Sequence, residues 1–366
     1  MGLKLIVACG GTGGHSFPGL AVADRLASRG HDVTVWMSGR DVESRVLKGW
    51  SGPVFATGAK QLSARNVFAN IRAFWRCRRE MKRERPDALL AMGSYSSLPP
   101  VIAADRCRVP IVLHEANTIP GRAIDFLSHY AKAVAISFER TADHFPGKET
   151  VLTGLPVRTD IAGQQPFDDV PTGAFCVFVT GGSQGAHRVN EIAVRALIDL
   201  NRDLASRGRA LHVIHQTGVK DEAMVAEAYS KAGMKARVNA FEHEMGRALA
   251  TADIVIARAG ASTCFELALT GKPAFLIPLP SAMRNHQHFN AAAFTAKQAA
   301  AEGIQDELTP RALSNWLLHK AENRDSLAKM AEGMRALARP EAADRVADLV
   351  ERIAKGGIGS WANSPM

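Results

Sequence analysis

Two glycine-rich turns have the composition and setting to bind an anion. The first spans residues 10–15 (Gly-Gly-Thr-Gly-Gly-His) and the second spans residues 181–186 (Gly-Gly-Ser-Gln-Gly-Ala); each follows an apolar run and precedes a stretch with helical spacing. Backbone N–H groups in such a turn approach an anion closely, and the helix N-terminus adds a partial positive charge, so phosphate is the expected ligand. Tight strand–helix turns also need glycine for steric reasons alone, so either turn by itself fits both interpretations.

The spacing in these turns argues against two common nucleotide-binding classes. A dinucleotide fingerprint in the first turn would need glycine at position 16, where the chain has Ser16. A P-loop would close with Gly-Lys-Ser or Gly-Lys-Thr, which neither turn contains. Two domains that each present a glycine turn to a central cleft fit instead a transfer between two phosphorylated molecules.

A third candidate loop, residues 258–266, follows an apolar run and opens a helix (Arg-Ala-Gly-Ala-Ser-Thr-Cys-Phe-Glu). Ser262 and Thr263 are suited to cap the helix or to contact a phosphate. Glu266 comes about one turn later, where it either accepts hydrogen bonds from a ribose diol or acts as an ordinary capping residue. The chain has no Asp-x-Asp motif and no His/Cys cluster with metal spacing, so we expect neither a metal nor another cofactor.

A basic and apolar stretch covers residues 67–85. Positions 72–85 hold seven Lys and Arg against two Glu. This composition is typical of a helix that binds the surface of an anionic bilayer. An amphipathic helix that packs its apolar stripe in the protein core explains it equally well. No nucleic-acid motif accompanies the charge. The residues assigned to membrane contact are Phe68, Ile71, Phe74, Trp75, Arg78, Arg79 and Lys82.

Predicted strands and helices alternate along the chain, and these elements must position the candidate residues. Apolar runs at 3–9, 32–37, 88–92, 111–113, 133–136 and 150–153 predict strands, and 18–28 predicts a helix. After a polar stretch at 164–173, the best candidate linker, the pattern recurs with strands at 175–179, 211–215, 254–257 and 274–277 and a helix at 189–200. Two copies of one unit predict two Rossmann-like α/β domains with parallel sheets.

Charge and cysteine content narrow the class of protein. The formal net charge is +9 over 366 residues, and residues 1–158 carry 22 Lys and Arg against 13 Asp and Glu, so the whole excess lies in the first half. A basic half implies an anionic partner for that half. The five cysteines form no CxxC pair, which favours a reducing cytoplasm. No apolar segment is long enough to span a bilayer, so we expect any membrane contact to be peripheral.

Several motifs in order resemble one family. They are the turn at 10–15 followed by Pro18-Gly19, the loop at 93–97, His114-Glu115-x-Asn117, Pro156-Val157-Arg158-Thr159-Asp160, the turn at 181–186, and Gln287 before Asn290. The chain is similar over almost its whole length to the bacterial peptidoglycan N-acetylglucosaminyltransferases that make lipid II from lipid I.

The resemblance implies a GT-B fold, with an N-terminal acceptor- and membrane-binding domain at 1–160, a UDP-sugar domain at 161–340, and a C-terminal helix at 341–355 that packs back on the first domain. It implies an inverting, metal-independent transfer from UDP-N-acetylglucosamine to lipid I at the cytoplasmic face of the inner membrane. It implies UDP-N-acetylglucosamine, lipid I and an anionic membrane surface as partners, and no nucleic acid.

The family's site residues map onto this sequence by position. Contacts to UDP-N-acetylglucosamine are expected from Thr12, Gly13, Gly14, Asn117, Arg158, Ser183, Glu242, Ala261, Ser262, Thr263, Glu266, Gln287 and Asn290. The acceptor diphosphate is expected near Gly11, Ser94, Tyr95 and Glu115. His15 is the expected general base, because an unperturbed imidazole has a pKa of about 6.5; a helix-capping or diphosphate contact is its alternative role, and Glu115 and Asp125 are the other candidates for the base.

The chain departs from the family pattern at three positions. Leu155 replaces Asn, Ala116 replaces Gln and Ser94 replaces a second glycine. Three alternatives stay open: a GT-B transferase with another lipid acceptor, a UDP-sugar epimerase, and a protein that binds UDP-sugar and membrane without catalysis.

Overall fold

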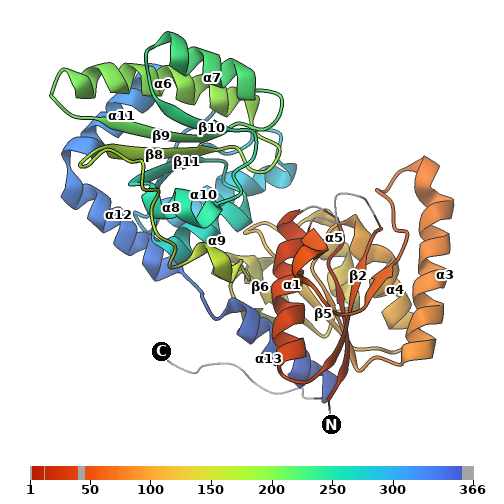
Figure 1. Ribbon diagram of the computed structural model, residues 1–366. Coiled ribbons are helices and arrows are strands. Elements are labelled where there is room, and N and C mark those ends of the chain that lie inside the picture. The colour runs from red at the N-terminus through yellow and green to blue at the C-terminus, as the bar shows by residue number, and fades with distance from the viewer. Residues whose placement is uncertain (1, 12, 40–45, 357–366) are drawn as a thin grey trace. The chain divides into compact units, whose positions relative to one another are not determined.

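The computed structural model describes residues 2–11, 13–39 and 46–356, and the chain forms two compact units (Figure 1). Unit 1 comprises Met1–Arg158 with Arg339–Met366, and unit 2 comprises Thr159–Ala338. The chain therefore passes between the units next to Arg158 and next to Arg339.

The stretch predicted as the linker, residues 164–173, instead packs on unit 2. Phe167 is 5% exposed, its N–H donates to Thr251 Oγ1, and the guanidinium groups of Arg237 and Arg247 lie over its ring. The linker prediction was wrong because one aromatic side chain anchors a segment that is otherwise polar.

Unit 1 contains a parallel sheet of seven strands in the order β3-β2-β1-β4-β5-β6-β7. The central strands are apolar on both faces, as expected for a sheet that helices cover on both sides. Their bounds are β1 (Lys4–Ala8), β2 (Asp32–Met37), β3 (Val54–Ala56), β4 (Ala88–Ala91), β5 (Ile111–Glu115), β6 (Ala133–Ile136) and β7 (Glu149–Leu152).

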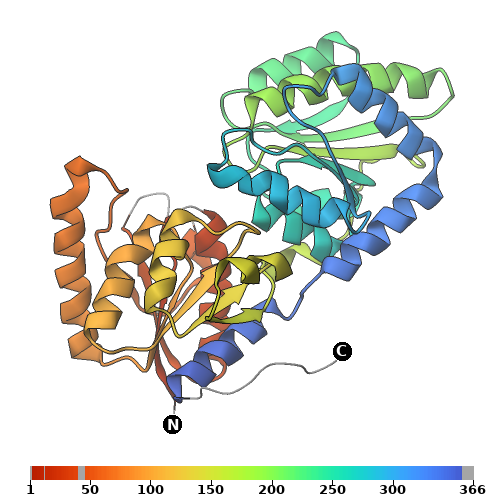
Figure 2. The same cartoon turned by 180° about the vertical axis from the view of Figure 1, so that it is seen from behind.

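Helices cover the two faces of this sheet (Figures 1 and 2). α1 (Gly13–Ser28) and α13 (Ala342–Ala354) share one core cluster, whereas α3 (Val67–Glu84), α4 (Leu98–Arg106) and α5 (Arg122–Leu127) lie over the other. Arg29 at the end of α1 reaches Asp344, Asp348 and Glu351 of α13 at 2.7–2.8 Å. The last helix is thereby fixed to the first half of the chain.

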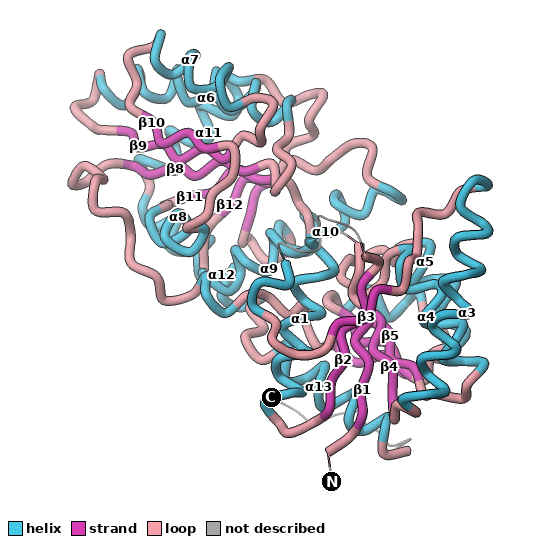
Figure 3. The backbone as a smooth tube through the Cα atoms, turned by 45° about the vertical axis from the view of Figure 1, so that its right-hand side comes forward, coloured by secondary structure: helices cyan, strands magenta, loops and turns pink. Residues whose placement is uncertain are grey.

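Unit 2 contains a parallel sheet of six strands in the order β10-β9-β8-β11-β12-β13. Helices flank this sheet in Figure 3. The strands are β8 (Phe175–Thr180), β9 (Leu211–Gln216), β10 (Ala236–Asn239), β11 (Ile254–Ala257), β12 (Ala274–Leu276) and β13 (Ala300–Glu302). The helices are α6 (His187–Ala205), α7 (Glu222–Lys231), α8 (Met245–Thr251), α9 (Ala261–Thr270), α10 (His286–Thr295), α11 (Pro310–Glu322) and α12 (Arg324–Leu337).

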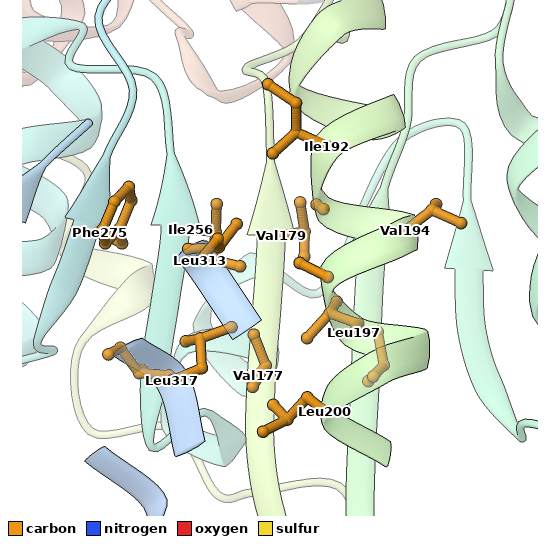
Figure 4. Close-up of a cluster of buried hydrophobic side chains, with 14 of the residues drawn as sticks. Val177, Val179, Ile192, Val194, Leu197, Leu200, Ile256, Phe275, Leu313 and Leu317 are labelled. Carbon is orange, nitrogen blue, oxygen red and sulfur yellow. The ribbon is translucent and has the colours of Figure 1, made fainter. Parts of the chain in front are cut away.

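The core of unit 2 lies between its sheet and two packed helices, α6 and α11. Figure 4 shows Val177 and Val179 of β8 facing Leu197 and Leu200 of α6. The apolar residues of α6 recur every three or four positions, which places them on one face of the helix.

Three short strands were not predicted from the sequence: β3, β10 and β13. β3 and β10 are short edge strands that are exposed or partly buried; the apolar run of β3 has three residues and the alternation of β10 covers four, too few to identify either strand. β13 is the opposite edge strand and has only three residues. α1 begins at Gly13, inside the first predicted turn, so His15 belongs to a helix. No helix in the described part of the chain combines the length and the apolar character needed to cross a membrane.

Candidate functional site

In each sheet the order of the strands reverses at one point beside the first strand of the unit. The next strands along the chain lie on one side of that strand, and the later strands lie on its other side. In unit 1 this point lies between β1 and β4, and in unit 2 it lies between β8 and β11. Ligands of open α/β sheets bind beyond the carboxyl ends of the strands at such points. The turns that follow β1, β8 and β11 are the three predicted loops, so the topology places all three at ligand-binding positions.

In unit 1 the loops after β1 and β4 are joined by hydrogen bonds. Ser96 Oγ donates to the Gly10 carbonyl, and Ser97 Oγ donates to the Gly93 carbonyl. Gly11 has a φ of 125°, and a Cβ atom there would lie 2.7 Å from Ser94 Oγ. The two predicted acceptor loops therefore form one surface in which glycine is required at position 11.

Ser94, one of the departures from the family pattern, adopts φ 70° and ψ 165°. This region is essentially restricted to glycine, and a side chain held in it costs on the order of 1–3 kcal/mol. Ser94 thus keeps a backbone conformation suited to glycine and adds a hydroxyl beside Gly11.

His15 lies in the first turn of α1, half-buried, next to the loop after β4. A Cβ atom on Gly93 would lie 3.5 Å from its Cδ2 atom. A second histidine, His114, is 1% exposed, and its Nε2 lies 3.2 Å from the Gly154 carbonyl. Because a carbonyl only accepts, Nε2 carries the hydrogen. Burial, with a smaller contribution from the nearby His15, lowers the pKa of His114 to about 4 although the bond to Gly154 opposes this shift, so His114 is neutral at pH 7.

Glu115 was expected to face the acceptor or to serve as a base, and its surroundings give it a structural role as well. Its side chain is 3% exposed. One oxygen accepts from the N–H and Nδ2 of Asn117 at 2.8 and 3.1 Å, and the other accepts from the N–H of Gly121 at 3.0 Å. Burial raises the pKa of Glu115, while these bonds oppose the rise. The carboxylate therefore holds the 116–121 loop in shape.

The remaining unit 1 candidates lie on α1 or in segments that follow the strands of the sheet. Arg158 places its guanidinium 5.5 Å from the ring centre of Phe17 on α1, and Tyr95 lies half-buried in the turn after Ser94. Asn117 is fixed by Glu115, while Gly13 and Gly14 begin α1. Leu155, another departure, is 1% exposed. Thr12 lies outside the described residues.

In unit 2 the glycine turn after β8 has a steric explanation. A Cβ atom on Gly185 would lie 2.0 Å from the Thr217 carbonyl oxygen, and one on Gly181 would lie 2.4 Å from the Ala186 nitrogen. The turn packs directly on the loop after β9, and Ser183 stays exposed at its tip. These two glycines are therefore required for folding whether or not a ligand binds.

The loop after β11 has a different character. Gly260 precedes α9 with φ −66°, and a Cβ atom there would meet no heavy atom within 4 Å. No side chain caps the helix, so the N–H groups of the first turn, including those of Ala261, Ser262 and Thr263, point outward without a helical partner. Glu266 lies one turn on from Ser262 and, like it, is half-buried. This end of α9 offers backbone donors, hydroxyls and a carboxylate on one face.

Of three other predicted contacts, two are committed to the protein itself and one is committed only in part. Asn290 is 0% exposed and donates to the Ala259 carbonyl at 3.1 Å, so it supports the 258–263 loop and presents no accessible atom to a sugar. Glu242 is 3% exposed, and its carboxylate accepts from Asn239 Nδ2 and the Glu244 N–H. Gln287 uses its oxygen to accept from the Leu279 N–H, which leaves its amide hydrogens for a ligand.

Two buried residues near the predicted nucleotide-sugar site were missed from the sequence. Gln216, the last residue of β9, bonds Gly182 of the turn after β8 and the N–H of Glu242. Arg258 donates to the carbonyls of Ile277 and Pro278 and to Gln305 Oε1, so it joins the loops after three strands. A polar residue at the carboxyl end of an apolar strand was the only available signal for either one.

No three His, Cys, Asp or Glu side chains among the described residues gather in a way that could hold a metal ion. Metal independence stays a prediction, because the lack of such a group of side chains says nothing of a metal held by a bound diphosphate.

Comparison with known proteins agrees with this arrangement. Residues 5–136 match the glycosyltransferase family 28 N-terminal domain, and residues 176–349 match the glycosyltransferase family 28 C-terminal domain. The solved structure of MurG from Acinetobacter baumannii is 31% identical with a TM-score of 0.77, and the match covers 96% of this chain and 100% of that chain. The GT-B fold predicted from the sequence is thereby confirmed. A putative UDP-N-acetylglucosamine 2-epimerase from Listeria monocytogenes has a TM-score of 0.75 but is 12% identical, which shows a shared fold alone.

Curated relatives match over nearly the full length. One from Geotalea uraniireducens is 34% identical over 362 residues, covering 96% of this chain and 98% of the relative, and one from Agrobacterium fabrum is 35% identical over 362 residues, covering 96% and 95%. Both are named UDP-N-acetylglucosamine–N-acetylmuramyl-(pentapeptide) pyrophosphoryl-undecaprenol N-acetylglucosamine transferase. The chain is therefore a glycosyltransferase and belongs to the family of these peptidoglycan N-acetylglucosamine transferases.

Proposed function

We propose that this chain transfers N-acetylglucosamine from UDP-N-acetylglucosamine to the 4-hydroxyl of the muramoyl sugar of lipid I, forming lipid II. The names of its relatives supply these substrates. The structural observation that carries the proposal is the open amino end of α9, where a glycine with no folding explanation precedes outward-pointing N–H groups. Those groups suit the diphosphate of the nucleotide sugar, and Glu266 suits its ribose.

The proposed reaction is a single displacement. The acceptor oxygen forms a bond to C1 of N-acetylglucosamine while the bond from C1 to the UDP oxygen breaks, and UDP leaves with the electron pair. His15 takes the proton of the attacking hydroxyl. The amino end of α9 stabilises the negative charge that develops on UDP, as preorganised backbone donors do. The loops around Gly11 and Ser94 receive the acceptor diphosphate. Because the acceptor oxygen attacks C1 from the side opposite the departing UDP oxygen, the single displacement inverts the configuration at C1.

The experiment is a UDP-release assay with UDP-N-acetylglucosamine and a diphospho-muramoyl-pentapeptide lipid. Release should require the acceptor and should persist in EDTA. The substitution His15→Ala should lower kcat by about 10²–10⁴, the usual contribution of a general base, with UDP affinity within about twofold of wild type.

The matched control is His144→Ala, which removes an exposed histidine elsewhere in unit 1 and should behave as wild type. Normal turnover by His15→Ala would remove His15 as the base. Release of UDP without acceptor, or conversion of UDP-N-acetylglucosamine to an epimer, would contradict the transferase proposal. Activity lost in EDTA and restored by magnesium would refute metal independence.

We further propose that the enzyme acts as a peripheral protein at the cytoplasmic face of the inner membrane and that α3 contacts the bilayer. Phe68 and Trp75 are 78% and 56% exposed, and Ile71 is exposed between them. Arg79 and Lys82 are exposed on the same helix, and Arg78 lies 5.3 Å from the Trp75 ring centre. Phe74, also expected at the membrane, instead turns toward α4 and is half-buried.

Phe68→Ser should weaken pelleting with anionic vesicles about tenfold or more, because a buried phenylalanine contributes roughly 1.5–3 kcal/mol. Ile304→Ser removes an exposed apolar side chain from unit 2 and serves as the control. Equal losses in the two variants would contradict a specific role for α3.

A further inference from the structure

Between α3 and α4 lies an apolar cavity of about 290 Å³. Its walls are mainly the side chains of Leu62, Val67, Ile71, Phe74, Leu98 and Ile102. Val67 and Ile71 are about half exposed, so the cavity opens along its rim. Nothing in the core clusters of unit 1 fills this space, although the surrounding side chains are those of a packed interface.

A second hollow continues the first along α3. The two share Phe74 and Ile102, and the second adds Trp75, Arg78 and Arg106. We call the two hollows together the trough; the residues named for each of them line it. The trough is apolar at the end near Leu62 and carries two arginines at the other end. A flexible apolar chain fits such a trough better than a folded protein surface does.

The trough begins where the predicted acceptor loop ends. Leu98 and Pro99 line it and directly follow Ser97, the residue whose hydroxyl bonds Gly93. Leu98 comes four positions after Ser94, so the two lie at most about 14 Å apart. A group covalently attached to a diphosphate at Ser94 is therefore held at high effective concentration near the trough entrance.

We propose that this trough binds the first isoprene units of the acceptor's polyprenyl chain. The inference rests on the proposed function and extends it from the sugar and diphosphate to the lipid. The tether to the diphosphate favours the acceptor's own chain over a phospholipid acyl chain, which has no such attachment. The exposed face of α3 around Phe68 then contacts the bilayer. The inner side of α3, beside Ile102, binds the start of one polyprenyl chain, which thereby leaves the bilayer.

The test compares acceptors that share the diphospho-muramoyl-pentapeptide and carry one, two or four isoprene units, assayed in detergent without a bilayer. For the wild type, kcat/KM should rise about tenfold from one to four units, which corresponds to roughly two buried methylene groups. Ile102→Trp fills the trough and should hold this rise to about twofold or less. Ser63→Trp, placed at the exposed lip, should do the same without disturbing the core.

Ile304→Trp adds the same side chain at an exposed position of unit 2 and is the matched control, with a rise equal to that of wild type. The KM for UDP-N-acetylglucosamine reports folding in every variant. Unchanged chain-length dependence in both trough variants would overturn the proposal. So would weaker binding of both variants to acceptor-free phospholipid vesicles with chain-length dependence intact, because the trough would then take an acyl chain. Failure of the wild type to use any acceptor would refute the proposed function itself.

Discussion

Replacing Gln216 with leucine tests whether a buried amide positions the nucleotide-sugar site. Gln216 is 1% exposed; its Nε2 donates to the Gly182 carbonyl at 2.8 Å and to Thr180 Oγ1 at 3.2 Å, and its Oε1 accepts from the Glu242 N–H at 3.0 Å. Leucine keeps most of the volume but leaves a carbonyl and an N–H unpaired. Each unpaired buried group costs about 1–3 kcal/mol, and water reaches half-buried Gly182, so we expect a loss of about 2–3 kcal/mol in unfolding free energy.

Part of that loss should appear in binding, because Gly182 and Glu242 belong to the two segments expected to meet the nucleotide. Calorimetric titration with UDP should give a Kd raised about tenfold, or 1.4 kcal/mol, and kcat at saturating nucleotide sugar should change less than threefold. Tyr229→Phe on α7 is the control. It removes a buried hydrogen bond to His215 Nδ1 of β9 without touching either segment. A Gln216→Leu protein with lowered stability and unchanged UDP affinity would refute the positioning role.

Two further predictions concern stability. Ser94→Gly should raise the unfolding free energy of unit 1 by about 1–3 kcal/mol, because it relieves a glycine-only conformation; urea unfolding measures this, and an unchanged midpoint would contradict the strain. Stability should also fall as pH drops below 6.5, because burial lowers the pKa of His215 to about 3, so the unfolded chain binds a proton that the native state does not. Each pH unit below 6.5 costs about 1.4 kcal/mol for this residue, and His215→Gln should flatten that slope in urea unfolding between pH 6.5 and 5; an unchanged slope would refute the assignment.

The central strands were predictable because their signal is local. β2, β6 and β11 have the predicted bounds, since each is an apolar run closed by polar or glycine residues. The edge strands were missed because they are short: β3 has three residues and β10 has four, and a pattern of that length also occurs in loops. The start of α1 was missed for a related reason: Gly13 and Gly14 have low helix propensity, and only the packing of the rest of the helix fixes them.

The site was predictable where function depends on one loop and unpredictable where it depends on contacts between loops. Ser262, Thr263 and Glu266 follow from helical spacing after a single turn. Gln216 and Arg258 act through partners between 19 and 47 residues away, so their roles exist only after the sheet has formed. Glu115 and Asn290 show the converse: both match the family pattern, and both are buried and bond loops that carry other candidates, a structural role that the pattern alone did not indicate.

The fold itself requires some of the loop glycines and does not require others. This difference helps to distinguish glycines with a steric role from glycines with a ligand-binding role. Gly181 and Gly185 would clash with neighbouring atoms at 2.4 and 2.0 Å if they bore a Cβ, and Gly11 needs both a φ of 125° and the space beside Ser94. Gly260 has an ordinary φ and open space, so alanine would fit there without strain. Since the fold places no demand on that position, the proposed function supplies a reason for glycine: a diphosphate would have to approach the backbone N–H groups of α9 closely. Under that proposal, we expect the turn after β8 mainly to pack the site together and the turn after β11 to meet the charge.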